Sequence, residues 1–175
     1  MSSSSIRMSL PGASGRMGRM ITKAVADRHD VVISAATDRP GVDEIGADLG
    51  RINGMDESGV VIADHAAALF DPKPDVAVDF TSTQVSAAHA LLCAEKGVPI
   101  VVGTTGLAED HINALKKAAE KTAVVWCANT SVGVTMLGQL VEDAVRALGE
   151  GWDIEIVEAH HKHKVDAPSG TALAL

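Results

Sequence analysis

The sequence predicts an α/β fold in which a doubly wound, parallel sheet is followed by the start of a second domain. Short apolar segments alternate with helical segments along most of the 175 residues, and this alternation is typical of βαβ units. Hydrophobic residues make up 46% of the chain but aromatic residues only 2%, so Val, Ala, Leu and Ile must form the core, as in buried parallel strands. Ligands bind beyond the carboxyl ends of such strands in Rossmann-like sheets. The glycine and polar residues expected at those ends are Gly12, Asp38, Thr81, Gly103 and Asn129.

Short apolar segments bounded by turn residues are predicted as the strands of this sheet. They are Ile6–Leu10, Val31–Ala36, Val60–Ala63, Val76–Phe80, Val98–Val102 and Ala123–Cys127. A further strand is predicted from Trp152 to Ala159, in the second domain. Residues 40–58, which are rich in Gly and Asp, are predicted as a surface excursion.

Helices are predicted between these strands by their apolar periodicity and by glycines at their ends. They are Arg16–Arg28, Asp64–Phe70, Ser82–Lys96, Ala108–Lys121, Val134–Leu148 and a helix that begins at Ser169. We expect two domains, residues 1–130 and residues 131–175, with the second domain truncated at Leu175.

The first helix carries apolar side chains at helical spacing, which predicts a buried face. The expected members of that face are Met17, Met20, Ile21, Ala24 and Val25. Arg19 is interpreted as a solvated helix position.

The formal net charge of −8 argues against binding to nucleic acid or to an anionic membrane, because neither polyanion would be attracted to most of the surface. Cys93 and Cys127 lie far apart without a CxxC motif, which favours free thiols in a reducing compartment. The polar start is unlike a signal peptide, and no apolar run is long enough to span a membrane. The expected location is therefore the cytoplasm.

The glycine turn GASGRMG follows the first strand and opens the first helix. Its glycines, Gly12, Gly15 and Gly18, permit a tight turn, a close approach of backbone to a pyrophosphate, and close helix packing. The spacing is GxxGxxG and not the commoner GxGxxG, so the turn alone is weak evidence. With its position between a strand and a helix, it predicts a dinucleotide site.

Asp38 lies 20 positions beyond Gly18, where a carboxylate could accept hydrogen bonds from the adenosine ribose. A plain turn residue before Pro40 is the competing interpretation. Arg39 could neutralise a 2′-phosphate, so the pair leaves NADH and NADPH both open as the cofactor. The loop GTTG, residues 103–106, is interpreted as lining the nicotinamide end, with an ordinary strand-to-helix turn equally compatible.

A cationic segment, HHKHK at residues 160–164, stands out in this acidic chain. A solvated face, a metal site and a catalytic site are the possible interpretations. Metal is disfavoured because neighbours on a strand point to opposite faces, so His160 and His161 cannot easily share one ion. The turn and helix start that follow, up to Thr171, favour a site for a small dicarboxylate. Histidine can exchange a proton near neutral pH and lysine can donate one, but the two electrons must come from a nicotinamide.

Together, GASGRMG, GTTG and EAHHKHKVDAPSGTA at residues 158–172 resemble the 4-hydroxy-tetrahydrodipicolinate reductase (dihydrodipicolinate reductase) family of the diaminopimelate route to lysine. The resemblance runs from about Ile6 to Leu175. It implies NAD(P)H-dependent reduction of a cyclic dicarboxylic substrate to tetrahydrodipicolinate. It also implies a second domain that binds substrate and, in longer family members, builds a homotetramer.

The resemblance implies specific roles for residues of this sequence. His160 is the expected proton donor or acceptor and Lys164 the expected proton donor. The expected substrate-binding residues are His161, Ser169, Gly170 and Thr171. The expected cofactor-binding residues are Gly12, Ala13, Ser14, Gly15, Arg16, Met17, Asp38, Arg39, Gly103, Thr104, Thr105, Cys127, Ala128, Asn129 and Thr130.

The sequence departs from the family pattern at Asp38, where Glu is commoner, at Thr130, where Phe or Met is usual, and in its length. Two alternatives to the reductase function therefore stand. One is a nucleotide-binding module or fragment with impaired catalysis. The other is an amino-acid or aldehyde dehydrogenase on the same fold, although neither cysteine suits the nucleophile that an aldehyde enzyme needs.

Overall fold

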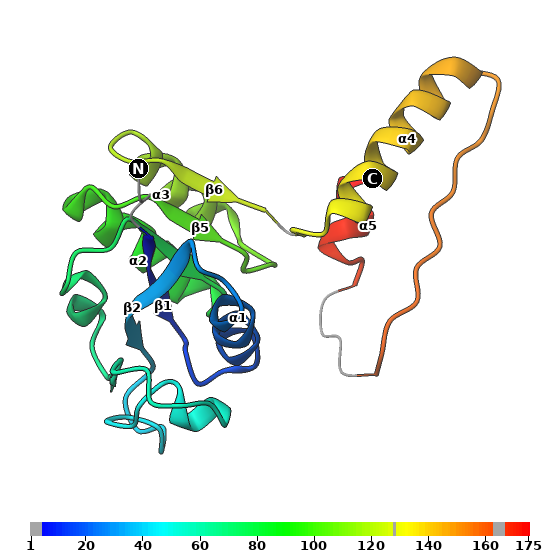
Figure 1. The fold of residues 1–175 in the computed structure, drawn as a ribbon. Helices are drawn as coiled ribbons and strands as arrows, with labels where there is room; N and C mark the ends of the chain where they lie inside the picture. Colours follow the sequence, from blue (N-terminus) through cyan, green and yellow to red (C-terminus); the bar gives the residue numbers. More distant parts are fainter. Residues whose placement is uncertain (1–4, 128, 163–166) are drawn as a thin grey trace. The chain divides into compact units, whose positions relative to one another are not determined.

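The structure is a computed structural model that describes residues 5–127, 129–162 and 167–175 (Figure 1). It divides into two units, Met1–Trp126 and Cys127–Leu175, and each is described by itself. The predicted functional division at residue 130 stays a prediction.

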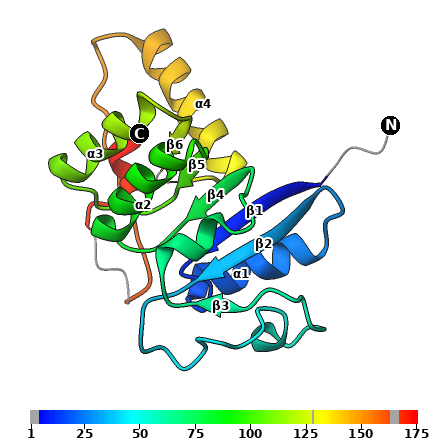
Figure 2. The same cartoon turned by 90° about the vertical axis from the view of Figure 1, so that its left-hand side faces the viewer.

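The first unit is built on a six-stranded sheet with the order β3-β2-β1-β4-β5-β6, in which every pairing of strands is parallel (Figure 2). The strands are β1 Ile6–Pro11, β2 Val31–Thr37, β3 Ile62–Ala63, β4 Val76–Asp79, β5 Ile100–Val102 and β6 Val124–Trp126. This order has its topological switch between β1 and β4, where the chain winds in opposite directions on the two sides. The predicted Rossmann-like doubly wound sheet is confirmed.

Helices cover both faces of the sheet (Figures 1 and 2). They are α1 Arg16–Ala26, α2 Thr83–Lys96 and α3 Glu109–Ala119, with short 3₁₀ helices η1 Arg51–Asn53 and η2 Ala66–Phe70 between β2 and β4. Helices α2 and α3 lie side by side on one face, and α1 lies on the opposite face.

The predicted buried face of α1 is partly wrong. Met20 is 60% exposed and Ala24 is also exposed, whereas the buried positions of the helix are Gly18 and Thr22. The reason is that α1 packs through its smallest residue: at Gly18 the helix lies so close to the backbone of the glycine turn that no side chain fits between them. Apolar periodicity alone cannot reveal packing by a glycine.

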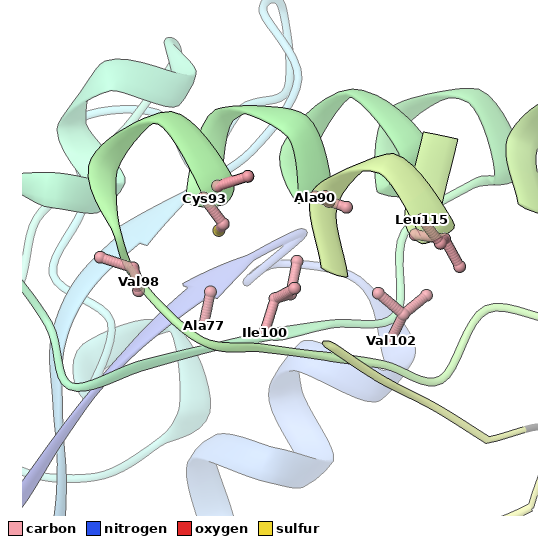
Figure 3. Close-up of a cluster of buried hydrophobic side chains, with 9 residues drawn as sticks. Ala77, Ala90, Cys93, Val98, Ile100, Val102 and Leu115 are labelled. Carbon is pink, nitrogen blue, oxygen red and sulfur yellow. The ribbon is translucent and has the colours of Figure 1, made fainter. Parts of the chain in front are cut away.

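The hydrophobic core lies on both faces of the sheet and contains small aliphatic side chains, as the composition predicts. Under α2 and α3, Ala90 and Cys93 face Ala77, Ile100 and Val102 of β4 and β5 (Figure 3). On the other side of the switch, a second cluster is formed by Leu10, Ala13, Ala36, Leu49 and Ile62. One cluster thus involves β4 and β5, and the other involves β1, β2 and β3 on the other side of the switch.

The second unit contains the helices α4 Val132–Leu148 and α5 Gly170–Ala174. Ser131 and Ser169 cap them, because each hydroxyl accepts a hydrogen bond from a backbone N–H in the first turn of the helix. The strand predicted from Trp152 to Ala159 is wrong: the structure assigns none there. A strand needs a neighbouring backbone, and no described segment pairs with these residues, which are exposed.

Candidate functional site

The glycine turn lies at the switch between β1 and β4, and its geometry requires glycine. Gly12 has a φ of +69°, and a Cβ there would come within 2.9 Å of Thr81 Cγ2. At Gly18 a Cβ would lie 2.3 Å from the carbonyl oxygen of Gly12. Ala13 N donates a hydrogen bond to Thr37 O at 3.1 Å, which joins the turn to the end of β2. The turn is therefore packed tightly against the end of β2 and against Thr81, which follows β4.

Asp38 is tied to the glycine turn by its carboxylate. Its Oδ2 accepts hydrogen bonds from Ser14 N at 2.9 Å and from Ser14 Oγ at 2.7 Å, while Oδ1 accepts from Arg39 N at 2.8 Å. The structure thus brings together residues that the sequence places 24 positions apart. Arg16 and Arg39 are exposed beside them, Gly15 is exposed, and Ala13 is buried.

Arg19 is not the solvated residue that the sequence predicts. Its Nε donates to Ser14 O at 2.8 Å, one terminal nitrogen donates to Ile52 O, and the other lies 2.6 Å from Glu44 Oε1. The side chain is 33% exposed. Arg19 therefore connects residues 44–52 to the glycine turn through hydrogen bonds and an ion pair. The sequence carried no local signal for this, because the partners lie 25 and 33 residues away.

A cavity of about 700 Å³ opens at this edge of the sheet, beside the glycine turn and Asp38. Its lining residues are Gly12, Ser14, Gly15, Thr37, Asp38, Arg39, Pro40, Val42, Glu44, Asp64, Ala66, Phe80, Thr81, Ser82, Val85 and His89. Small polar groups form the wall nearest the turn, and Phe80 and Val85 supply apolar surface. This mixture suits a ligand with both charged and flat apolar parts.

Asp79 is fully buried at the carboxyl end of β4 and forms the centre of a polar network. Its Oδ1 accepts from Thr81 N at 2.9 Å, Thr81 Oγ1 at 2.7 Å and Ser86 Oγ at 2.7 Å, and its Oδ2 lies 2.6 Å from His89 Nδ1. Ser86 Oγ also lies 2.7 Å from Thr104 Oγ1. Asp79, Ser86 and His89 were not expected as site residues, and an apolar-flanked Asp at a strand end is the only sequence signal for them.

The loop GTTG is docked onto the end of β4. Gly103 N donates to Asp79 O at 2.8 Å, and a Cβ on Gly103 would lie 2.0 Å from the ring of Phe80, so only glycine fits beneath that ring. Thr104 is 8% exposed, and its carbonyl oxygen accepts from Trp126 Nε1 at 3.2 Å. Thr105 is exposed. The loop is therefore held at the end of β4, and its cofactor role stays a prediction.

The buried network has a clear electrostatic character. Burial by itself raises the pKa of Asp79, but the hydrogen bonds from His89, Ser86 and Thr81 outweigh it, so the pKa lies below its ordinary value. Asp79 is therefore ionised at neutral pH. Burial, together with the negative charge of Asp79, raises the pKa of the Cys93 thiol to about 12. A thiol in that state does not act as a nucleophile near neutral pH.

In the second unit, the structure brings together two of the predicted groups. Asn129 Nδ2 donates to Thr171 Oγ1 at 2.9 Å, so the cofactor-binding segment predicted at 127–130 contacts the predicted substrate-binding segment at 169–171. Cys127 Sγ donates to Asn129 O, and Thr130 is exposed. Cys127, Asn129, Gly170 and Thr171 also line a cavity of about 210 Å³.

Glu158 connects His160 with the start of α5. Its Oε2 lies 3.2 Å from His160 Nδ1, and its Oε1 accepts a hydrogen bond from Ser169 N at 2.7 Å. His160 is 39% exposed at its side chain, and His161 is also exposed. Glu158 is the first residue of the motif EAHHKHKVDAPSGTA, and the sequence predicts no role for it. Lys164 and Ala128, two further predicted site residues, lie outside the described residues.

Among the described residues, no group of three or more His, Cys, Asp or Glu side chains is arranged to hold a metal ion. Within the same part of the chain, no helix combines the length and the apolar composition needed to cross a bilayer.

Comparison with known proteins identifies the family. Residues 6–130 match the family described as dihydrodipicolinate reductase, N-terminus, and residues 133–175 match dihydrodipicolinate reductase, C-terminus. The chain belongs to the dihydrodipicolinate reductase family. The family assignment expected from the three sequence motifs is confirmed, and both the turn at Gly12 and the cationic segment fall within the matched ranges.

Members of the dihydrodipicolinate reductase family are also similar to the chain individually. A 4-hydroxy-tetrahydrodipicolinate reductase from Halorhodospira halophila is 47% identical over 171 residues, which cover 98% of this chain and 64% of the relative. One from Alkalilimnicola ehrlichii is 46% identical over 169 residues, covering 97% and 63%. A dipicolinate-bound dihydrodipicolinate reductase from Paenisporosarcina sp. TG-14 has a TM-score of 0.71 at 28% identity, covering 97% of this chain and 63% of its own. The chain thus spans less than two thirds of the length of these relatives.

Proposed function

We propose that the protein uses a reduced nicotinamide dinucleotide to convert 4-hydroxy-tetrahydrodipicolinate to tetrahydrodipicolinate, as an oxidoreductase of lysine biosynthesis. The observation that carries the proposal is the cavity at the switch between β1 and β4, walled by the glycine turn and Asp38, in a member of this family. The two relatives that match 97–98% of this chain are both named for this activity. The same proposal includes a homotetramer, as implied by the family resemblance, which light scattering would test.

The residues of the cavity fit a dinucleotide. Gly12 and Gly15 line the cavity at the start of α1, where backbone N–H groups would face a pyrophosphate. Asp38 stands at the end of β2, where ribose hydroxyls would donate to it. Phe80, whose ring lies over Gly103 of the GTTG loop, lines the same cavity and offers a flat apolar surface for a ring. When bound, the nicotinamide supplies the hydride.

The second unit would hold the substrate and move the protons. We assign His160 as proton donor or acceptor and Lys164 as proton donor to the ring carbon beside the reduced one, with His161, Ser169, Gly170 and Thr171 holding the substrate carboxylates. The contact of Glu158 with His160 supports this assignment, because a carboxylate on Nδ1 orients an imidazole and leaves Nε2 for the substrate. The hydrogen bond from Asn129 Nδ2 to Thr171 Oγ1 supports the proposal that the cofactor-binding segment 127–130 and the substrate-binding segment 169–171 act together.

The choice between NADH and NADPH depends on Asp38 and Arg39. The Asp38 carboxylate already accepts hydrogen bonds from Ser14 and from Arg39 N, which reduces its capacity for ribose hydroxyls. The Arg39 side chain is exposed beside it and can pair with a 2′-phosphate. We therefore predict that NADPH binds more tightly than NADH.

Arg39→Ala should weaken NADPH binding by about tenfold, the loss of one charge-assisted contact of roughly 1.5 kcal/mol, and should change NADH binding less than twofold. Isothermal titration with both cofactors measures the two effects separately. An equal loss for both cofactors would show that Arg39 does not contact the 2′-phosphate.

A coupled assay tests the reaction directly. Aspartate semialdehyde, pyruvate and the preceding synthase generate the substrate, and the oxidation of NADPH and NADH is followed by absorbance. Lys164→Ala should lose turnover and keep dinucleotide affinity, whereas the matched change Lys162→Ala should keep both. If the 175-residue protein binds dinucleotide without turnover, the alternative of a catalytically impaired nucleotide-binding module is correct for this chain.

The aldehyde dehydrogenase alternative is disfavoured by the state of the cysteines. Cys93 is buried with its pKa raised to about 12, and Cys127 directs its thiol to Asn129 O. An aldehyde enzyme needs an accessible thiolate. Turnover that survives alkylation of the native protein with iodoacetamide would exclude this alternative.

A further inference from the structure

We infer that Arg19 allows an anionic dinucleotide to bind by neutralising Glu44, a carboxylate on the wall of the cavity at the glycine turn. The inference rests on the proposed function and adds a positioning residue to it. Arg19 is not one of the residues that line the cavity, so it acts on the ligand through Glu44.

The cavity is acidic for a site that would hold phosphates. Among the described residues that line it, Asp38, Glu44 and Asp64 carry carboxylates, whereas Arg39 is the only Lys or Arg. A dinucleotide carries negative charge on its pyrophosphate, and like charges repel one another at short range. The carboxylates of the wall must therefore be compensated if such a ligand is to bind well.

Two of the three carboxylates are compensated without Arg19. Asp38 accepts hydrogen bonds from Ser14 N, Ser14 Oγ and Arg39 N. The Asp64 side chain is 56% exposed and lies 3.1 Å from His65 Nδ1, so water weakens the field of its charge. Neither carboxylate depends on the α1 helix for a cation.

Glu44 is compensated by Arg19. Its side chain is 30% exposed, and Arg19, which lies 2.6 Å from its Oε1, is the only cation paired with it in the part of the chain that the structure describes. The guanidinium is held in place, because Nε donates to Ser14 O at 2.8 Å and a terminal nitrogen donates to Ile52 O. A cation fixed at this carboxylate cancels most of the repulsion that a ligand would meet from it.

Arg19→Met tests the inference, since it removes the charge and keeps a long side chain. The affinity for NADPH, measured by titration calorimetry, should fall about fivefold because Glu44 then carries an unpaired charge at the cavity wall. In about 0.5 M KCl the loss should shrink below about twofold, because salt screens a charge repulsion. A loss caused only by a displaced backbone would persist in salt.

Glu44→Gln separates the charge from the other contacts of Arg19. Alone, it should leave the affinity for NADPH unchanged or raise it by up to about threefold, because Arg19 keeps its charge. Added to Arg19→Met, it should restore the affinity to within about twofold of the wild type. Arg19→Lys keeps the charge without the planar fork of donors, and it should also stay within about twofold.

Arg51→Met and Glu57→Gln are the matched controls. Arg51 and Glu57 form an ion pair of the same length, 2.6 Å, in the same excursion of residues 40–58, and neither of them lines the cavity. Both variants should keep the wild-type affinity for NADPH at low and at high salt.

The outcomes separate the inference from the proposed function. If Arg19→Met has no effect, if its loss persists in salt, or if the double variant stays as weak as Arg19→Met, the inference is overturned while the proposed function stands. A loss with Glu44→Gln alone would show that Glu44 itself contacts the ligand, which overturns it equally. If the wild type does not bind NADPH, the proposed function fails and the inference with it. Should Arg19→Met not fold, Arg19→Lys and Glu44→Gln still decide, since a fivefold loss with either contradicts the inference.

Discussion

At the scale of single residues, Gly18 is a position where the addition of one methyl group should disturb the packing of α1 against the glycine turn. A Cβ there would lie 2.3 Å from Gly12 O and 2.6 Å from Ala13 O, and backbone atoms cannot move aside as a flexible side chain would. The residue therefore sets the distance between α1 and the turn that the proposed pyrophosphate would contact.

Gly18→Ala should lower the free energy of unfolding by about 1–3 kcal/mol, the cost of overpacking, and should weaken dinucleotide binding because the turn is displaced. Urea denaturation and calorimetric titration measure the two effects. Gly133→Ala is the matched control, since the nearest atom to its Cβ is Ser131 Oγ at 3.7 Å within a helix, and it should be neutral or stabilising by about 0.5 kcal/mol. Equal effects of the two changes would contradict the packing argument.

Asp79 predicts a pH dependence whose sign follows from its lowered pKa. A carboxyl group with a lower pKa in the native state stabilises the fold above its unfolded pKa of about 4, and this stabilisation is lost as the pH falls through the native value. Asp79→Asn should therefore lower the free energy of unfolding at pH 7 by about 1–3 kcal/mol, because the donors around it lose an ionised acceptor.

The difference between wild type and Asp79→Asn should shrink as the pH is lowered below about 4, since protonated Asp79 resembles the amide. Urea denaturation at a series of pH values measures it. A difference that stays constant down to the acid transition would mean that Asp79 is not ionised in the native protein.

The sequence could predict candidate residues only where the pattern that indicates their role lies in neighbouring positions of the chain. The glycines of the turn and Asp38 stand next to the strands that explain them. Arg19 and Ser86 could not be found in this way, because their roles come from partners that only the fold brings near, Ile52 for the former and Thr104 for the latter. Chemical type alone makes both look like ordinary helix residues.

At the scale of secondary-structure elements, α2 connects the core to the candidate site. Cys93 and Ala90 pack into the core beneath it, while Ser86 and His89 on the same helix bond to Asp79. Its end is a Schellman motif: Gly97 N bonds to Ala94 O at 3.3 Å, and Val98 N bonds to Cys93 O at 2.9 Å. The motif fixes where the chain leaves the helix to form β5.

Gly97→Ala should lower the free energy of unfolding by about 1 kcal/mol, because Gly97 has a φ of +62° and a Cβ disfavours that conformation. Gly97→Asn is the control, since Asn tolerates the left-handed region better and should cost less than Ala. Thermal or urea denaturation ranks the three proteins. If Ala and Asn are equivalent to Gly, the backbone at Gly97 is not held in this conformation.

Element prediction succeeded for the sheet of the first unit and failed at 152–159. In the sheet, apolar strands are bounded by helices and turns, so local pattern and tertiary pairing agree. The apolar residues Trp152, Ile154 and Ile156 alternate as in a strand, but they are exposed and no described backbone pairs with them. Alternating apolar side chains are compatible with a β-strand. A strand also needs the backbone of a second strand to pair with, and the local sequence cannot show whether one is present.

At the scale of the whole molecule, the first unit holds most of the residues proposed to bind the cofactor, and residues 127–130 of that set lie in the second unit. All six strands, both core clusters, the glycine turn and the cavity lie within Met1–Trp126. The proposed proton-transfer residues lie in the other unit, Cys127–Leu175. Every residue proposed to bind the cofactor nevertheless lies within residues 1–130.

A fragment of residues 1–130 should fold alone and bind dinucleotide. It contains the whole six-stranded parallel sheet with helices on both faces, and a domain of this size buries enough apolar surface to be stable by itself. Its affinity for NADPH should lie within about threefold of that of the 175-residue chain, a difference below 1 kcal/mol. Circular dichroism, urea denaturation and calorimetric titration test the three parts of the prediction. A fragment that folds cooperatively but loses more than tenfold in affinity would show that residues beyond 130 contact the cofactor, and the assignment of cofactor binding to residues 1–130 would then be wrong.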